Sequence, residues 1–385
     1  MKKNYLALIT MIFLCAFTQC TQQKITETEV NFSREAIISE ADRYLQQPPV
    51  PITSFSSERS AGSIHDFYSE GDYWWPNPED MEGPYIRKDG QTNPANFTAH
   101  RESMRDLSRW IAALTAAYQL TEDEKYAQKA LEHLRAWFLN KQTMMNPSLL
   151  YAQAIKGKVT GRGIGIIDTI HLIEVAKSVQ VLEKLGFLTG TDLAGLKNWF
   201  DQYVTWLTTH SYGIDERDHG NNHSTWWAAQ AAAFAKLTGR EEVLVLCREQ
   251  FKKLLSAQMD ETGGFPEELG RTKPFNYTLF NIEGYAVLAY FASTSDDDLW
   301  NYETKDGSLR KAIDFISPFL LDKNSWPYTP DVQHFDEIPI QSAFLLFASQ
   351  VYQNDQYLET WKKLPLERKS KEVDRNFPIR QLVLW

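Results

Sequence analysis

Cysteine is scarce in this sequence, which holds three cysteines in 385 residues. Two of them, Cys15 and Cys20, lie near the start of the chain, and Cys247 is the third. A chain with one cysteine in its main body has no disulfide framework. The apolar neighbours of Cys247 in LVLCREQ predict a buried, unreactive thiol in the core.

Positive charge is also in short supply. Forty lysines and arginines stand against fifty aspartates and glutamates, which gives a net charge of -10. Because affinity for nucleic acid comes from basic patches, this balance argues against a nucleic-acid partner. It does not exclude an anionic substrate, since arginines and lysines can line a cleft on an acidic protein.

The N-terminal apolar run, residues 6–17, is too short to cross a bilayer comfortably. Two lysines precede it, and its length is typical of a signal peptide, which we expect over residues 1–20. The letters FTQC, ending at Cys20, loosely resemble a bacterial lipoprotein signal, with Cys15 as the alternative. We therefore expect an exported protein, periplasmic or held at the outer membrane through a lipidated Cys20.

Strand-like alternation is scarce, and helical periodicity dominates the rest of the chain. Apolar residues recur at three- and four-residue spacing, as in Leu107, Ile111, Leu114 and Tyr118. The segments with such helical character are 33–46, 100–119, 122–139, 166–185, 191–209, 223–237, 241–258, 277–292, 308–321 and 340–353. Paired helices with short connections predict one all-α domain over residues 21–385, an α/α toroid.

One long stretch, about 50–98, lacks periodicity and is rich in proline, glycine, serine and aromatic residues. A structureless loop of this length is usually functional or disordered, and its aromatic content argues against disorder. We expect it to lie across the groove of the toroid. Tyr73, Trp74, Trp75 and Arg87 could pack on and pair with acidic sugars, or the aromatics could simply pin the loop.

The stretch HGNNHSTWWAAQ, residues 219–230, carries two histidines four positions apart. HGNNH lacks the glutamate that follows the first histidine in zinc proteases, so we expect no metal. Glycine and asparagine favour a turn before a helix that Asn222 or Ser224 would cap. Capping is one interpretation; a carboxylate site made by Asn222 and His223, supported by His219, is the one we favour.

The stretch EELGRTKPFNYTLFN, residues 267–281, contains Arg271 and Tyr277 on either side of Pro274. The proline prevents the two from sharing one helix face, so Arg271 should lie on a loop and Tyr277 near the next helix start. Spacing alone allows a catalytic pair or a surface arginine with a core tyrosine.

The stretch GKVTGRGIGIIDT, residues 157–169, lacks the full GxGxxG spacing of a nucleotide-binding loop, and we predict no strand before it. It predicts a flexible loop that presents Arg162 to a cleft.

Three blocks together resemble the alginate-lyase-like superfamily of polysaccharide lyases: YWWPNPEDMEGPYIRKDG at 73–90, NNHSTWW at 221–227 and ELGRTKPFNYTLFN at 268–281. HDFYSEGDYWWP at 65–76 is most similar to exported bacterial lyases that act on alginate or glucuronan. The resemblance implies an α/α toroid without a cofactor. It assigns catalysis to Asn222, His223, Arg271 and Tyr277. It assigns substrate binding to Tyr73, Trp74, Trp75, Arg87, Arg162, Asn221 and Trp226.

Such a lyase removes the C5 proton of a uronate and expels the C4 oxygen. Asn222, His223 and Arg271 would stabilise the charge that develops on the carboxylate, and Tyr277 would carry the proton, with its pKa lowered by the arginine. In mannuronate and glucuronate the C5 hydrogen and the C4 oxygen lie on one side of the ring, so one tyrosine could transfer both protons. Guluronate has them on opposite faces and needs a second base, His223. We expect a monomer acting on alginate, with glucuronan as the alternative.

Two other classes stay open on the sequence. A glycoside hydrolase would need two carboxylates flanking one bond, and nothing pairs Asp218, Glu267 and Glu268. A glycan-binding lipoprotein would use the aromatic loop and have no need for the histidine, arginine and tyrosine.

Overall fold

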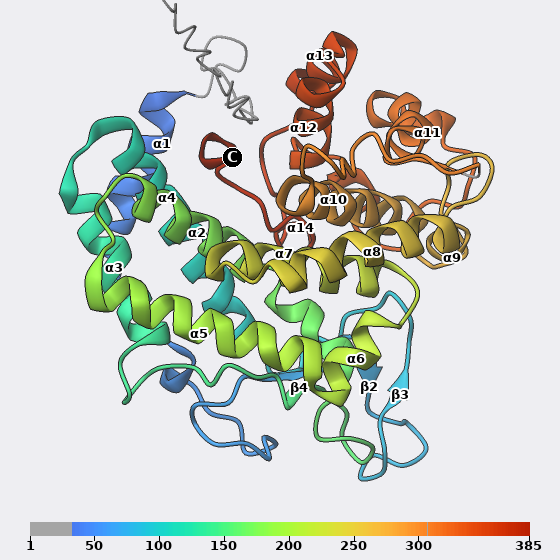
Figure 1. Ribbon diagram of the computed structural model, residues 1–385. Coiled ribbons are helices and arrows are strands. Elements are labelled where there is room, and N and C mark those ends of the chain that lie inside the picture. Colours follow the sequence, from blue (N-terminus) through green and yellow to red (C-terminus); the bar gives the residue numbers. More distant parts are fainter. Residues whose placement is uncertain (1–32, 306) are drawn as a thin grey trace, which may run out of the picture.

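A computed structural model describes residues 33–305 and 307–385, so the expected signal peptide and Cys20 lie outside the described residues. Five helices form an inner series in which each contacts the next: α2 (Ala99–Thr121), α4 (Leu172–Lys184), α7 (Asn222–Thr238), α10 (Pro274–Ala292) and α12 (Ala343–Val351). Outer helices pack on this series: α1 (Arg34–Tyr44), α3 (Glu124–Phe138), α5 (Gly190–Thr209), α8 (Glu241–Gln258), α11 (Leu309–Leu321) and α13 (Asp355–Lys363). The arrangement is the predicted α/α toroid (Figure 1).

The inner helices are buried because their sequences are apolar or small on every side. In α7 and α10 nearly every residue is buried, including Trp227 and Tyr285. Outer helices such as α3 bury one face only, with Tyr126 and Leu134 inside. None of the helices in the described part of the chain is long and apolar enough to cross a membrane.

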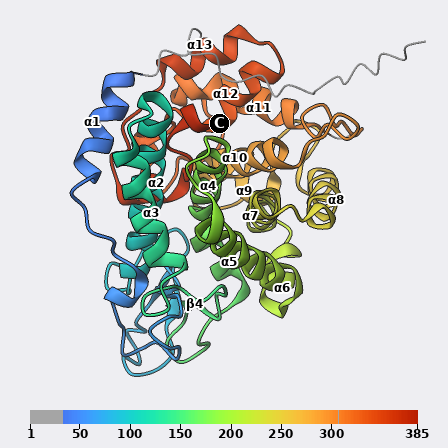
Figure 2. The ribbon, with the colours of Figure 1, turned by 60° about the vertical axis from the view of Figure 1, so that its left-hand side comes forward.

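The long loop predicted over 50–98 contains short regular elements, which corrects the expectation of a structureless segment. They are η1 (Ile52–Ser54), β1 (Tyr68–Glu70), β2 (Trp74–Trp75) and β3 (Ile86–Arg87). β2 pairs antiparallel with β3, and β1 pairs in parallel with the distant β4 (Tyr151–Ala154). The loop and its strands gather at one end of the helices, away from α11, α12 and α13 (Figures 1 and 2).

Several short elements were not predicted because three to nine residues show too little periodicity. They are α6 (Ser211–Arg217), α9 (Pro266–Leu269), α13, α14 (Lys371–Asn376), η3 (Lys323–Ser325), η4 (Phe335–Glu337) and η5 (Leu382–Leu384). The helix predicted from 166 begins instead at Leu172. A 3₁₀ turn, η2 (Gly163–Thr169), precedes it, so the segment after Arg162 is regular structure and the expectation of a flexible loop was wrong.

Candidate active site

A cavity of about 480 Å³ lies where the β2–β3 hairpin, η2, the starts of α7 and α10, and α14 meet. Six arginines line it: Arg87, Arg101, Arg105, Arg162, Arg271 and Arg375. Two aspartates, Asp72 and Asp168, are the lining carboxylates among the described residues. In a chain of net charge -10, this local excess of positive charge favours an anionic ligand.

The start of α7 is capped by Asn221, not by Asn222 or Ser224 as predicted. The Asn221 side chain accepts a hydrogen bond from the His223 backbone N–H at 3.1 Å. Gly220, at φ +99°, makes the left-handed turn that places Asn221 before the helix. Ser224 instead accepts from the Gly220 N–H at 2.8 Å.

Asn222 faces the cavity and is fixed from behind by Glu268 of α9. Its backbone N–H and its side-chain amide each donate to one carboxylate oxygen of Glu268 at 2.8 Å. Glu268 is 1% exposed, and burial raises its pKa, against the two bonds from Asn222. Both oxygens of Glu268 are therefore committed to orienting the asparagine.

His223 is oriented by a second buried carboxylate, Glu216 of α6. The Nδ1 atom lies 2.8 Å from Oε1 of Glu216, whose side chain has no exposed surface. When Nδ1–H donates to this carboxylate, Nε2 is left free to accept a proton. Burial and the neighbouring His223 lower the pKa of His219, which lines the same wall. The start of α7 thus presents an imidazole whose orientation is fixed by a buried carboxylate.

The start of α10 presents Tyr277. Its hydroxyl lies 2.9 Å from that of Tyr73, and Nη2 of Arg271 donates to it at 3.3 Å. Arg271 lies between α9 and α10, as predicted, and its guanidinium centre is 4.4 Å from the Tyr277 ring centroid. Asp89, from the loop after β3, accepts from Nη2 of Arg271 at 3.0 Å. Asp331 accepts from two backbone N–H groups in the first turn of α10 and so fixes its start.

The pKa of Tyr277 is shifted opposite to the sequence-based expectation. Burial raises it well above its usual range, Tyr73 and Asp89 raise it further, and Arg271 alone among these opposes them. Desolvation of the hydroxyl outweighs the arginine, whose charge is shared with Asp89. Tyr277 is therefore favoured as a phenol, which suits a proton donor.

The aromatic loop supplies two of its three predicted aromatic contacts to the cavity. Tyr73 and Trp74 line it, and so do Arg87 and Arg162. Lys158 lies 5.3 Å and Arg162 5.9 Å from the Trp74 ring centroid, so cations flank this aromatic face. Trp75 lies outside the lining, where its indole donates to the Gln91 carbonyl at 2.9 Å.

Trp226 is not at the cavity surface, which corrects its assignment to substrate binding. It has no exposed area, and its indole N–H donates to the Phe280 carbonyl at 3.0 Å. Its role is to join α7 to α10 in the core.

One wall of the cavity, which was not predicted from the sequence, is formed by α2, the start of α4 and the C-terminal α14. Its residues are Arg101, Arg105, His171, Arg375 and Asn376. Asp72, next to Tyr73, forms ion pairs with both Arg101 and Arg375. One signal in the sequence could have indicated this wall. Arg101 and Arg105 are four positions apart, on the same helix face as the buried Ser108 and Ala112.

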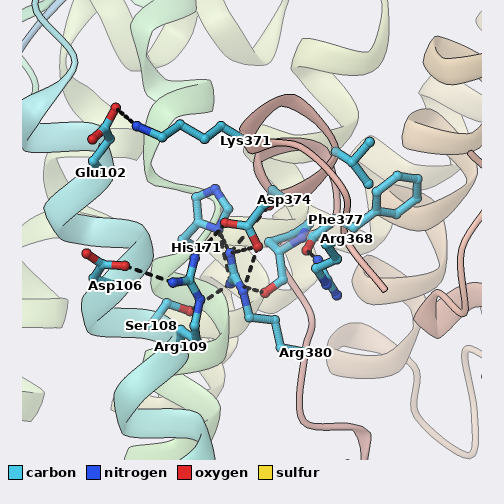
Figure 3. Close-up of polar contacts among 12 residues, drawn as sticks. Glu102, Asp106, Ser108, Arg109, His171, Arg368, Lys371, Asp374, Phe377 and Arg380 are labelled. Atoms are coloured by element: carbon cyan, nitrogen blue, oxygen red, sulfur yellow. Dashed lines mark hydrogen bonds and ion pairs between the residues drawn. The ribbon is translucent and has the colours of Figure 1, made fainter. Parts of the chain in front are cut away.

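Ion pairs fasten α14 to α2 and to the segment that follows α14 (Figure 3). Asp374 accepts from Arg109 of α2 at 2.9 Å and from Arg380 at 3.1 Å, and Lys371 pairs with Glu102 of α2 at 2.9 Å. These contacts hold the neighbouring Arg375 against the cavity.

The carboxylates required by a hydrolase are not positioned for that role. Asp72 and Asp168 both bind Arg101, and Glu268 is committed to Asn222. Asp218 pairs with Arg217 at 2.6 Å. Nor do three histidine, cysteine, aspartate or glutamate side chains gather into a metal-binding group anywhere in 33–305 or 307–385.

The cavity brings an imidazole, a phenol and fixed arginines together in an α/α toroid, a combination typical of a polysaccharide lyase. The model of the alginate lyase family matches residues 52–326, and the chain belongs to this family. An alginate lyase from Bacteroides ovatus is 32% identical, with a TM-score of 0.78 over 91% of this chain and 92% of that one. α14 lies beyond the residues that the family model matches.

More distant structures share the fold. Alginate lyase A1-III from Sphingomonas species A1 is 14% identical, with a TM-score of 0.53 over 83% of this chain and 87% of that one. A variant of A1-III complexed with a tetrasaccharide is 14% identical, with a TM-score of 0.55 over 87% and 91%. No curated protein matches the sequence significantly.

Proposed function

We propose that the protein cleaves alginate by β-elimination and leaves a C4=C5 double bond on one product. The observation that carries this proposal is that two proton-transfer groups enter one arginine-lined cavity. They are the His223 imidazole at the start of α7 and the Tyr277 hydroxyl at the start of α10. The name of the Bacteroides ovatus relative supports alginate as the polymer.

The reaction begins with the uronate carboxylate bound beside Asn222, His223 and Arg271. A base takes the C5 proton, the C–H electrons form the C4=C5 bond, the C4–O bond breaks, and the departing oxygen takes a proton. Negative charge builds on the carboxylate as the C5 proton leaves. Fixed donors at that position are each worth roughly 10²–10³ in rate.

The two residues divide the proton transfers according to the sugar. In guluronate the C5 hydrogen and the C4 oxygen lie on opposite faces, so His223 is the base and Tyr277 the acid. In mannuronate they lie on one side, and Tyr277 performs both steps after losing its proton. Because burial raises the pKa of Tyr277, its hydroxyl keeps its proton and can act as an acid. It must first lose that proton before it can act as a base.

The test is ultraviolet absorbance, which the new conjugated double bond creates. Block-pure polymannuronate, block-pure polyguluronate and glucuronan would be compared under the same conditions. We expect absorbance to grow with the alginate polymers. New reducing ends without absorbance would show a hydrolase, binding without products would show a glycan-binding protein, and faster cleavage of glucuronan would reassign the polymer.

We also propose that the enzyme is exported and monomeric, and that it lies in the periplasm or at the outer membrane. Attachment of the protein to the membrane through a lipidated Cys20 can be tested with the full chain. Cys20→Ala should move the protein from the membrane fraction to the soluble fraction, and an unchanged distribution would contradict lipidation at that residue.

A further inference from the structure

Arg105 of α2 differs from every other arginine of the cavity. It is 7% exposed and lines the cavity, yet no described residue forms a hydrogen bond or ion pair with its side chain. The other five each have a partner: Arg87 and Arg271 bind Asp89, Arg101 binds Asp168, Arg162 binds Gln153, and Arg375 binds Glu372.

The surroundings of Arg105 make this isolation unfavourable. Burial lowers its pKa and the charge of Arg375 lowers it further; Asp374 opposes this, Arg101 adds to it, and Glu102 opposes it, and the net shift is downward. His171, on the same wall, adds no negative charge, and burial lowers its pKa well below its usual range. Asp374 and Glu102 offset part of this charge from a distance, but no carboxylate among the described residues is bonded to the buried guanidinium, so its N–H donors are available to a ligand in the cavity.

The position of Arg105 separates it from the reacting atoms. Arg375 is close enough to Tyr73 and Tyr277 to exchange electrostatic influence with them, and it also acts on Arg105. Arg105 lies one helical turn from Arg101 on α2, and Arg101 is paired with Asp72, the residue before Tyr73. Tyr73 in turn contacts Tyr277, so Arg105 lines the same cavity as the tyrosine but from a different wall.

We propose that Arg105 binds the carboxylate of a second uronate, in a subsite next to the sugar on which Tyr277 acts. This inference rests on the proposed function. A guanidinium offers paired N–H donors that match a carboxylate, and the polymer carries one carboxylate on every sugar. Asp374, the residue before Arg375 on α14, is held by Arg109 and Arg380 (Figure 3), so this wall of the cavity is fixed by the fold itself.

The experiment compares Arg105→Met and Arg105→Lys with the wild type on a mannuronate tetrasaccharide and on polymannuronate. Arg248→Met is the matched control. Arg248 is equally buried, at 8% exposed, but it has the partners Glu241 and Ala292 and lies outside the cavity lining. The readouts are KM, kcat and the melting temperature of the empty protein.

For Arg105→Met we expect KM to rise about tenfold or more, because a charge-assisted hydrogen bond is lost, while kcat changes less than about threefold. The melting temperature should stay the same or rise, since a buried charge without a bonded partner is removed. Arg105→Lys should recover part of the affinity. Arg248→Met should lower the melting temperature and leave KM unchanged.

An unchanged KM in Arg105→Met would overturn the subsite, whatever the melting temperature does. So would a rise in KM that comes with a lowered melting temperature and is not reduced in Arg105→Lys. A wild type that makes no unsaturated product from alginate would instead overturn the proposed function, so the two failures are distinguishable.

Discussion

The two helix starts that meet in the cavity are built differently. At α7, His223 and Asn222 are held by Glu216 and Glu268, which are buried on the short helices α6 and α9. At α10, the partners of Arg271 and Tyr277 are Asp89 and Tyr73, which come from the long aromatic loop. The side chain of Asp89 is 27% exposed, whereas that of Glu216 has no exposure.

The packed helices fix the orientation of His223, whereas the long loop sets the surroundings of Tyr277. The orientation of His223 depends on packed helices and should persist without substrate. The proton affinity of Tyr277 depends on Tyr73 and Asp89, so it can change when a polymer displaces or reorders the loop. We expect substitutions at the two helix starts to differ in which sugar, and which pH range, they affect.

The largest effect is expected from Tyr277→Phe, which keeps the ring and removes the oxygen that carries the proton. Turnover on both block types should fall by about 10³ or more, while a calorimetric binding constant for the tetrasaccharide stays within a few fold. Tyr73→Phe is the control, since it removes only the neighbouring hydroxyl and should retain much more activity. Turnover above about one per cent in Tyr277→Phe would remove this residue as the acid.

Glu216→Gln should act on the other helix start. A glutamine amide can donate to Nδ1 and so permit the tautomer whose Nε2 is already protonated and cannot act as a base. Initial rates on polyguluronate should fall roughly 10²-fold, with a smaller loss on polymannuronate. Equal losses on the two polymers would mean that Glu216 supports the site as a whole and does not set the histidine's tautomer.

The pH dependence should distinguish the two sugars. With the pKa of Tyr277 raised well above its usual range, the reactive phenolate is scarce at neutral pH. Each added pH unit below that pKa increases the phenolate about tenfold, so polymannuronate rates should climb with pH. Polyguluronate cleavage, which uses the phenol, should lack this climb, and parallel profiles would contradict the division of roles.

Asp89→Asn sharpens the same measurement. The charge of Asp89 raises the pKa of Tyr277, so its removal should move the polymannuronate profile to lower pH and leave the polyguluronate profile in place. A shift to higher pH would show that Asp89 acts mainly by positioning Arg271.

At the other end of the range, we expect a chelator to have no effect on activity. The HGNNH stretch forms a capped helix start whose His223 is already bound to Glu216. Initial rates on alginate should be the same before and after EDTA treatment. Loss of activity that zinc or calcium restores would overturn this interpretation of the stretch.

Motif residues and long helices could be predicted from the sequence because their signals are local. The 3.6-residue pattern located the inner helices, and the order of NNH, Arg271 and Tyr277 identified the two helix starts. The second wall of the cavity could not be predicted, since Arg105 and Arg375 come from elements that are 270 positions apart. Desolvation of Tyr277 is likewise a property of the assembled cavity, which is why its pKa shift was predicted with the wrong sign.

The most direct test of the account is His223→Ala on block-pure polymers, followed by initial absorbance rates. If His223 is the base for guluronate, polyguluronate cleavage should fall much further than polymannuronate cleavage, because a phenolate on one face cannot reach a proton on the other. Both rates should fall to some degree, since the imidazole also stabilises the carboxylate. Equal losses on the two polymers would confine His223 to charge stabilisation, and undiminished rates would contradict the proposed site.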